Sequence, residues 1–136
     1  MRARIVILGL IYLLMLGSAF SAEKRDDFNP WQSLFTEPIE TLYIIMEDRV
    51  AFKYSNQNEI EVRMTLGKLE KQLRTSKRNY KIENIVVIIH NHLRGCTFSP
   101  ADKRLHWRLK KYGFRGRFLL YSHTTNKTYD IEDKSN

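Results

Sequence analysis

Hydrophobic and polar residues alternate with a short period in the first part of this chain of 136 residues. Ile39 to Met46 is rich in β-branched and aromatic residues, and Val50 to Tyr54 follows it after the polar turn Glu47-Asp48-Arg49. This pattern predicts two strands that form a hairpin. Between Ile60 and Met64, apolar and polar side chains alternate, which predicts a third, half-buried strand.

Two later segments have the spacing of amphipathic helices. Leucines recur at helical intervals between charged residues from Leu66 to Leu73, which predicts a helix that ends near Asn79. Ser99-Pro100 combines a favoured N-cap residue with a favoured first helical residue, so a second helix is expected to begin there. Gly113 is a suitable C-terminal stop for that second helix.

The remaining elements determine the fold class. Ile82 to Ile89 is a nearly continuous apolar run dominated by Val and Ile, which predicts a strand buried on both faces. Phe118 to Tyr121 and Thr128 to Ile131 are predicted as late strands on either side of the turn Thr124 to Lys127. Early hairpins combined with a late strand–helix–strand unit indicate an α/β (α+β) domain, with a mixed central β-sheet flanked by helices.

The N-terminus has the pattern of a secretory signal peptide. Arg2 and Arg4 precede an apolar run from Ile5 to Leu16, and small residues follow it. The apolar run is shorter than the ~18–20 residues that a membrane span requires. We therefore expect residues 1–22 to be cleaved and the protein to be exported to the periplasm or the extracellular space, without a stable membrane anchor. An uncleaved anchor is the alternative.

The rest of the chain suits one domain. Residues 23–38 are predicted to be a polar lead-in from which Trp31, Leu34 and Phe35 dock on the core, and residues 39–136 form the domain itself. The single cysteine excludes an internal disulfide and any multi-cysteine zinc finger.

Candidate chemistry is concentrated after the buried strand. His90 and His92 lie two residues apart, so both imidazoles point to the same face of the strand. Asp102 follows in the first turn of the second predicted helix. Two histidines and one carboxylate have the composition of a catalytic zinc site whose fourth position holds water. Ser99 and Asp102 also fit a helix capping box, which requires no metal, and the two interpretations are compatible.

A known family shares this arrangement. His90-Asn91-His92, a short loop and Ser99-Pro100-Ala101-Asp102 together resemble the JAMM motif of the JAB/MPN metallopeptidase superfamily. That superfamily includes deubiquitinating enzymes and bacterial and archaeal JAB proteins. Glu40 begins a strand similar to the early glutamate strand of the family. The chain departs from the pattern at Leu93, where the family usually has proline, and in a loop that is one residue shorter.

The resemblance implies a fold, an activity and a set of site residues. It implies an MPN/cytidine-deaminase-like core and a zinc-dependent metallopeptidase of the bacterial JAB type that hydrolyses a peptide or isopeptide bond. The predicted signal peptide makes this an exported enzyme. His90, His92 and Asp102 would bind Zn²⁺, and a water molecule would complete the site. Glu40 would be the general base, and Ser99 would donate a hydrogen bond to the oxyanion.

Some assignments remain open at this stage. Glu37 and Glu47 are alternatives to Glu40, which is preferred because the hydrophobic strand follows it directly. The chain lacks the insertions that hold ubiquitin in the deubiquitinating enzymes, so peptides of the cell envelope are the more natural substrates. A catalytically silent MPN-like binding or scaffold module, and a basic domain that binds an anionic polymer, are the competing function classes.

The net charge of +8 bears on the choice of partners. Basic residues cluster on and after both predicted helices. Such clusters can bind nucleic acid or anionic surfaces, although they are more often solvated helix faces. No nucleic-acid-binding module is recognisable and export makes such a partner unexpected, so anionic envelope components are the natural partners. The clusters comprise Lys68, Lys71, Arg74, Lys77, Arg78, Lys81, Lys103, Arg104, Arg108, Lys110, Lys111, Arg115 and Arg117.

Overall fold

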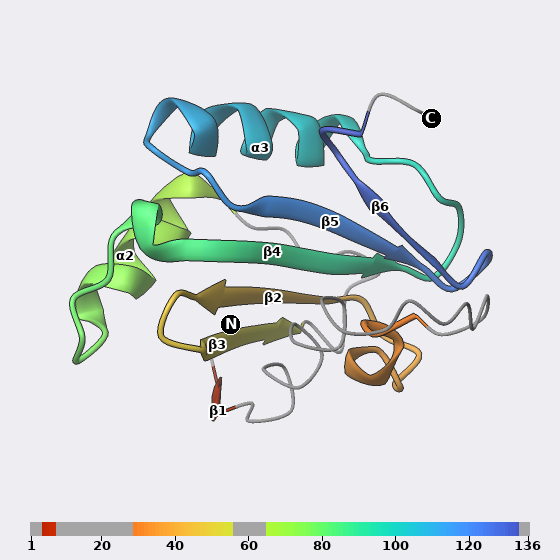
Figure 1. Ribbon diagram of the computed structural model, residues 1–136, viewed down its shortest axis with the longest axis horizontal. Coiled ribbons are helices and arrows are strands. Elements are labelled where there is room, and N and C mark those ends of the chain that lie inside the picture. The colour runs from red at the N-terminus through yellow and green to blue at the C-terminus, as the bar shows by residue number, and fades with distance from the viewer. Residues whose placement is uncertain (1–3, 8–28, 56–64, 134–136) are drawn as a thin grey trace, which may run out of the picture.

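The computed structural model describes residues 4–7, 29–55 and 65–133 (Figure 1). The predicted strand from Ile60 to Met64 lies outside these residues, as does the predicted signal peptide apart from Arg4–Ile7, which form β1. The other elements are η1 (Gln32–Leu34), β2 (Thr41–Met46), β3 (Val50–Ser55), α2 (Leu66–Thr75), η2 (Ile82–Asn84), β4 (Ile85–His92), α3 (Pro100–Lys111), β5 (Arg117–Ser122) and β6 (Lys127–Asp130).

The strands form one mixed sheet. Its order is β1-β3-β2-β4-β5-β6, in which β4 and β5 are parallel and every other neighbouring pair is antiparallel. The connection between the two parallel strands runs through α3, because parallel neighbours need a crossover rather than a tight turn. The predicted mixed sheet with flanking helices is therefore confirmed. Within the described residues, no helix is long and apolar enough to cross a membrane.

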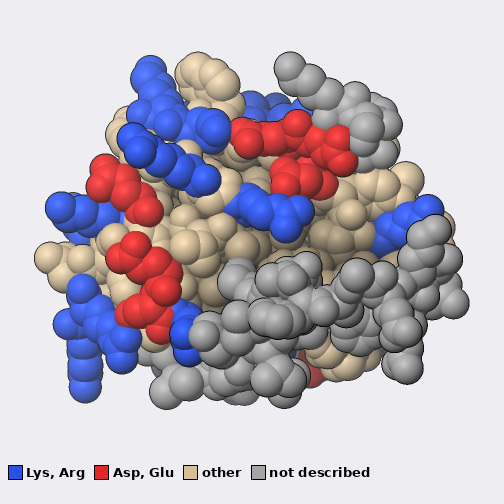
Figure 2. All heavy atoms as spheres, in the orientation of Figure 1, with Lys and Arg blue, Asp and Glu red and all other residues tan. Residues whose placement is uncertain are grey.

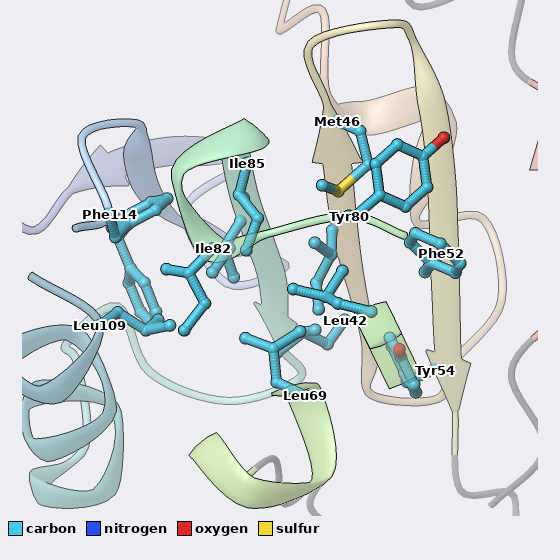
Figure 3. Close-up of a cluster of buried hydrophobic side chains, with 14 of the residues drawn as sticks. Leu42, Met46, Phe52, Tyr54, Leu69, Tyr80, Ile82, Ile85, Leu109 and Phe114 are labelled. Carbon is cyan, nitrogen blue, oxygen red and sulfur yellow. The ribbon is translucent and has the colours of Figure 1, made fainter. Parts of the chain in front are cut away.

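Both helices cover the same face of the sheet. Leu69 and Leu73 of α2 and Leu105 and Leu109 of α3 point inward and pack against apolar side chains of the sheet. Figure 3 shows this layer, with the side chains of the helices, of β2 and β3 and of the segment before β4 pointing toward one another. The leucine spacing in the sequence thus marks the buried side of each helix correctly.

The opposite face is covered by the segment before β2. Phe35 is buried there, stacked on Tyr121 of β5 with a centroid distance of 5.3 Å and edge-on to Tyr43 of β2 at 5.6 Å. Trp31 and Leu34 pack partly against the same layer. The prediction that these three residues dock on the core is confirmed, and it explains why β4 is apolar on both sides.

Most strand limits differ from the predicted ones by one to three residues, and two of the differing boundaries have a clear physical cause. The first helix ends at Thr75 rather than near Asn79, because Ser76 adopts an extended conformation and its hydroxyl donates to the Leu73 carbonyl at 2.7 Å. The central strand begins at Ile85 rather than Ile82. Residues 82–84 form a 3-10 turn instead, in which the Asn84 side chain accepts a hydrogen bond from the Lys81 N–H at 2.9 Å.

The end of α3 is the one that the sequence predicts. Gly113 has a φ of +98°, a conformation that glycine adopts without strain. Its N–H donates to the Lys110 carbonyl, and the Phe114 N–H donates to the Leu109 carbonyl, which together make a Schellman motif. Phe114 and Leu109 belong to the same buried cluster, so the stop also fixes where β5 begins.

We predict that Phe35→Ala lowers the free energy of unfolding by about 3–5 kcal/mol, because it empties the apolar layer on that face of the sheet. Urea denaturation measures the change. Gln32→Ala, an exposed substitution in the same segment, should stay within about 0.5 kcal/mol of the unsubstituted protein. Equal effects of the two substitutions would contradict the packing described for this face.

Candidate metal centre

The two candidate histidines lie at the C-terminal end of the central strand. His90 pairs with Leu42 of β2 on one side and with Leu120 of β5 on the other. His92 follows two residues later, pairs with Ser122 of β5, and faces the same side, with its ring centroid 5.0 Å from that of His90. Because β4 is hydrogen-bonded on both edges, its backbone holds the two imidazoles in fixed relative positions.

Asp102 reaches the histidines from the first turn of α3. The Ser99 hydroxyl accepts from the Asp102 N–H at 3.1 Å, and Asp102 Oδ2 accepts from the Ser99 N–H at 2.7 Å. This is the capping box that the sequence predicts, and it satisfies two backbone donors at the helix start. The same hydrogen bonds fix the direction of the carboxylate, so the structural and the metal-binding interpretations hold together.

The three side chains form one compact cluster. Asp102 Oδ1 lies 3.3 Å from His90 Nε2, and Asp102 Oδ2 lies 3.6 Å from His92 Nε2. Candidate ligand atoms of all three residues lie within 4.8 Å of one another. A tetrahedral zinc ion with bonds of about 2.0–2.1 Å separates its ligand atoms by roughly 3.3 Å. The two measured contacts are close to that separation.

The surroundings keep the carboxylate ionised. Burial alone would raise the pKa of Asp102, but the facing imidazoles of His90 and His92 and the Ser99 N–H outweigh it and hold this pKa well below its usual value. Metal ligands must be deprotonated to bind, so an aspartate that stays ionised is prepared for a cation.

His90 provides the test of whether a metal fits. The residue is 7% exposed, and both of its ring nitrogens are buried without a hydrogen-bond partner among the residues that the structure describes. Its contact with Asp102 is therefore an ion-pair distance and not an aligned hydrogen bond. An unsatisfied buried polar group costs about 1–3 kcal/mol, and an ion bound at Nε2 would remove the cost for that atom. The donor set of two imidazoles and a carboxylate fits zinc.

The structure ties the two other predicted residues to this cluster to different degrees. Ser99 is the N-cap of α3 and exchanges two hydrogen bonds with Asp102. Glu40 is half-buried and directly precedes β2, whose pairing with β4 ends at the Leu42–His90 pair. Glu40 is not a member of the cluster of candidate ligands.

Asn91, to which the sequence analysis assigned no role, holds the Glu40 backbone. Its Oδ1 accepts from the Thr41 N–H at 2.6 Å, and its Nδ2 donates to the Ile39 carbonyl at 3.0 Å. These are the two peptide groups on either side of the Glu40 Cα. Asn91 is 1% exposed, and an asparagine enclosed by histidines at the end of an apolar strand is the signal that could have revealed it.

A third contact of Asn91 reaches His123, in the turn between β5 and β6. Asn91 Nδ2 lies 2.8 Å from His123 Nε2. Because the other contacts of the amide fix its orientation, Nε2 must accept, and we assign a neutral ring with its proton on Nδ1. Burial lowers the pKa of His123, in agreement with that assignment. The His123 N–H also donates to the His92 carbonyl at 3.1 Å, which ties this turn to the end of β4.

The loop between His92 and Ser99 is also tied to this turn. The hydroxyl of Ser122, a fully buried residue, donates to the Gly95 carbonyl at 2.7 Å, and the Gly95 N–H donates to the Thr124 hydroxyl at 3.2 Å. Cys96, in the same loop, is not a member of the cluster of candidate ligands. The loop is therefore anchored at Gly95 to the end of β5 and the turn after it.

Comparison of the chain with protein-family models, with curated proteins and with solved structures gave no match.

We predict that the protein binds one equivalent of Zn²⁺ and that His90→Gln, His92→Gln and Asp102→Asn each weaken binding strongly, because each removes one of three ligands. Isothermal titration and elemental analysis measure affinity and stoichiometry. Zinc at 100 times its dissociation constant should also stabilise the fold by about 2.7 kcal/mol, which provides a readout that needs no activity.

His106→Gln is the matched control for zinc binding. His106 lies on α3, one turn beyond Asp102, and is partly buried against Phe114 and Phe118, but it is not in the ligand cluster. Its substitution should leave zinc affinity unchanged. Zinc binding that is absent from the unsubstituted protein, or lost equally in the control, would rule out the metal centre.

Removal of the Asn91 amide should destabilise the protein. Asn91→Ala leaves the Thr41 N–H and the Ile39 carbonyl without their partner, at a cost of about 1–3 kcal/mol for each group that stays buried and unsatisfied. Asn29→Ala removes hydrogen bonds to Trp31 and to the β5–β6 hairpin in a less buried setting, where water can replace the lost partners, so it should cost less than Asn91→Ala. A similar loss in both variants, measured by urea denaturation, would show that Asn91 holds nothing essential.

Proposed function

We propose that this protein is an exported zinc-dependent hydrolase of the JAMM type, with an MPN-like core, that cleaves a peptide or isopeptide bond. The observation that carries the proposal is the cluster of His90, His92 and Asp102, which includes an ionised carboxylate and a buried imidazole with unsatisfied nitrogens. The order of the segments along the chain supports it: a glutamate before an early strand, a hairpin, a helix, a buried strand that ends in His-x-His, and a helix that begins with Ser-x-x-Asp.

Zinc bound by these three residues would supply Lewis-acid polarisation and an acidic water molecule. The chain's own residues then divide the remaining work. Glu40, whose flanking peptide groups are bonded to Asn91, takes a proton from the attacking water in this proposal and passes it to the leaving amine. The Ser99 hydroxyl accepts from the Asp102 N–H, and its single proton serves as the donor to the oxyanion of the tetrahedral intermediate.

The setting of the cluster suits a substrate that arrives from solution. The side chains of His92 and Asp102 are 18% and 17% exposed, whereas that of His90 is 9% exposed. His92 and Asp102 are thus the two members of the cluster that solvent reaches more readily, and His90 lies deeper. Envelope peptides are the substrate class that the predicted export favours. A catalytically silent module of the same fold is the competing function.

The decisive experiment compares Glu40→Gln with Glu37→Gln. Glu40→Gln should lower the rate of peptide hydrolysis by about 10²–10⁴-fold while the zinc content stays at one equivalent, because it removes the base and keeps the ligands. Glu37 is exposed and lies three residues away, so its substitution should leave the rate unchanged.

A panel of peptidoglycan fragments, unstructured peptides and ubiquitin-like conjugates, assayed with the zinc-loaded protein, supplies the substrate for this comparison. Zinc binding without hydrolysis of any member of the panel would favour the silent module. Equal activity of the Glu40→Gln variant and the unsubstituted protein would reject Glu40 as the base.

A further inference from the structure

The outer face of α3 combines an exposed tryptophan with several cations. Leu105 and Leu109 are the buried residues of this helix. Trp107 is 64% exposed, and successive helical residues rotate by about 100°, so Trp107 lies on the side opposite the two leucines. Tyr112, at the C-terminal end of the helix, is 55% exposed. The exposed cations of the helix are Lys103, Arg104, Arg108, Lys110 and Lys111.

These cations surround the tryptophan. Lys103 and Lys111 lie one turn before and one turn after Trp107, and Lys111 Nζ is 5.5 Å from the centroid of the Trp107 ring. This distance is a cation–π contact, which places a positive charge directly beside the apolar crest. Figure 2 shows Lys and Arg side chains gathered at the edge of the molecule that α3 forms.

Most of this charge is not compensated within the protein. Lys110 pairs with Glu132 at 2.7 Å. The other four cations make no ion pair with any residue that the structure describes. After Asp102 the helix itself carries no acidic side chain, and Glu132 is the one carboxylate that the structure describes in an ion pair with its cations.

We propose that this face of α3 binds the surface of a membrane that contains anionic phospholipids. Tryptophan is favoured at the boundary between lipid and water because its ring is apolar and its N–H is polar. Lysine and arginine near the surface are attracted by the headgroup phosphates. The exposed face of a helix is convex, and Trp107 projects from its middle, which suits contact with a flat surface such as a membrane. A nucleic-acid strand calls for a groove with several stacking side chains instead. The inference does not depend on the proposed hydrolase activity.

The test measures binding of the full chain to vesicles of phosphatidylcholine with and without phosphatidylglycerol, by co-sedimentation. The triple variant Arg104→Gln/Arg108→Gln/Lys111→Gln should lose about 100-fold in affinity for anionic vesicles, since each surface cation contributes about fivefold. The apolar N-terminal segment is common to all variants, and neutral vesicles report its contribution.

The triple variant Lys68→Gln/Lys71→Gln/Arg74→Gln is the matched control. It removes the same charge from exposed positions of α2, where the structure describes no exposed tryptophan. It should lose only a few-fold in affinity. Both triple variants should unfold at the same melting temperature as the unsubstituted protein, which would show that a loss of vesicle binding does not come from misfolding.

Fluorescence locates the contact. In the Trp31→Phe variant, Trp107 is the only tryptophan, and its emission should shift to the blue with anionic vesicles and return in high salt. The Trp107→Phe variant should show no such shift. An equal loss of binding in the α2 variant, a missing blue shift, or tighter binding to a single-stranded oligonucleotide than to the vesicles would each overturn the proposal.

Discussion

Burial of the central strand β4 determines where every candidate functional group lies. The helices cover one face of this strand and the segment around Phe35 covers the other, while β2 and β5 hold its edges. A slip of one residue would turn every side chain of this strand over, so the residues that fit one apolar layer would have to pack in the other and the histidines would change faces. The polar residues at its end, from His90 to His92, are therefore fixed by packing that occurs elsewhere in the domain.

The candidate site adds two local devices to this support. The capping box of α3 satisfies the helix start and fixes the Asp102 carboxylate with the same two hydrogen bonds. The Asn91 amide satisfies buried peptide groups and fixes the backbone that carries Glu40. In both cases the hydrogen bonds that stabilise the fold also orient a carboxylate of the candidate site or the backbone that carries one. The capping box and the Asn91 amide therefore each have a structural role and a proposed functional role.

Much of the fold could be read from residue spacing, since the apolar run of β4, the leucines of α2 and the Ser99–Gly113 limits of α3 are local signals. The C-terminal end of α2 and the start of β4 could not be predicted in this way. Ser76 and Asn84 set them through side-chain hydrogen bonds, which leave no trace in the hydrophobic periodicity. The common face of His90 and His92 followed from strand alternation, and the place of Asp102 in the first helical turn followed from helix capping, whereas the family resemblance was what implied that the three converge. The roles of Asn91 and His123 depend on contacts between residues far apart in the chain, and sequence spacing has no access to them.

The three candidate ligands lie within a short stretch of chain, from His90 to Asp102, whereas Glu40 is distant in sequence. Closing a short loop costs little entropy, and local contacts form early during folding. All three candidate ligands therefore come from β4 and the start of α3, which a short loop connects. Glu40 arrives when β2 pairs with β4. Selection can consequently alter the base or its strand and keep the cation-binding part intact, so the order of assembly itself offers a route from a catalyst to a binding protein.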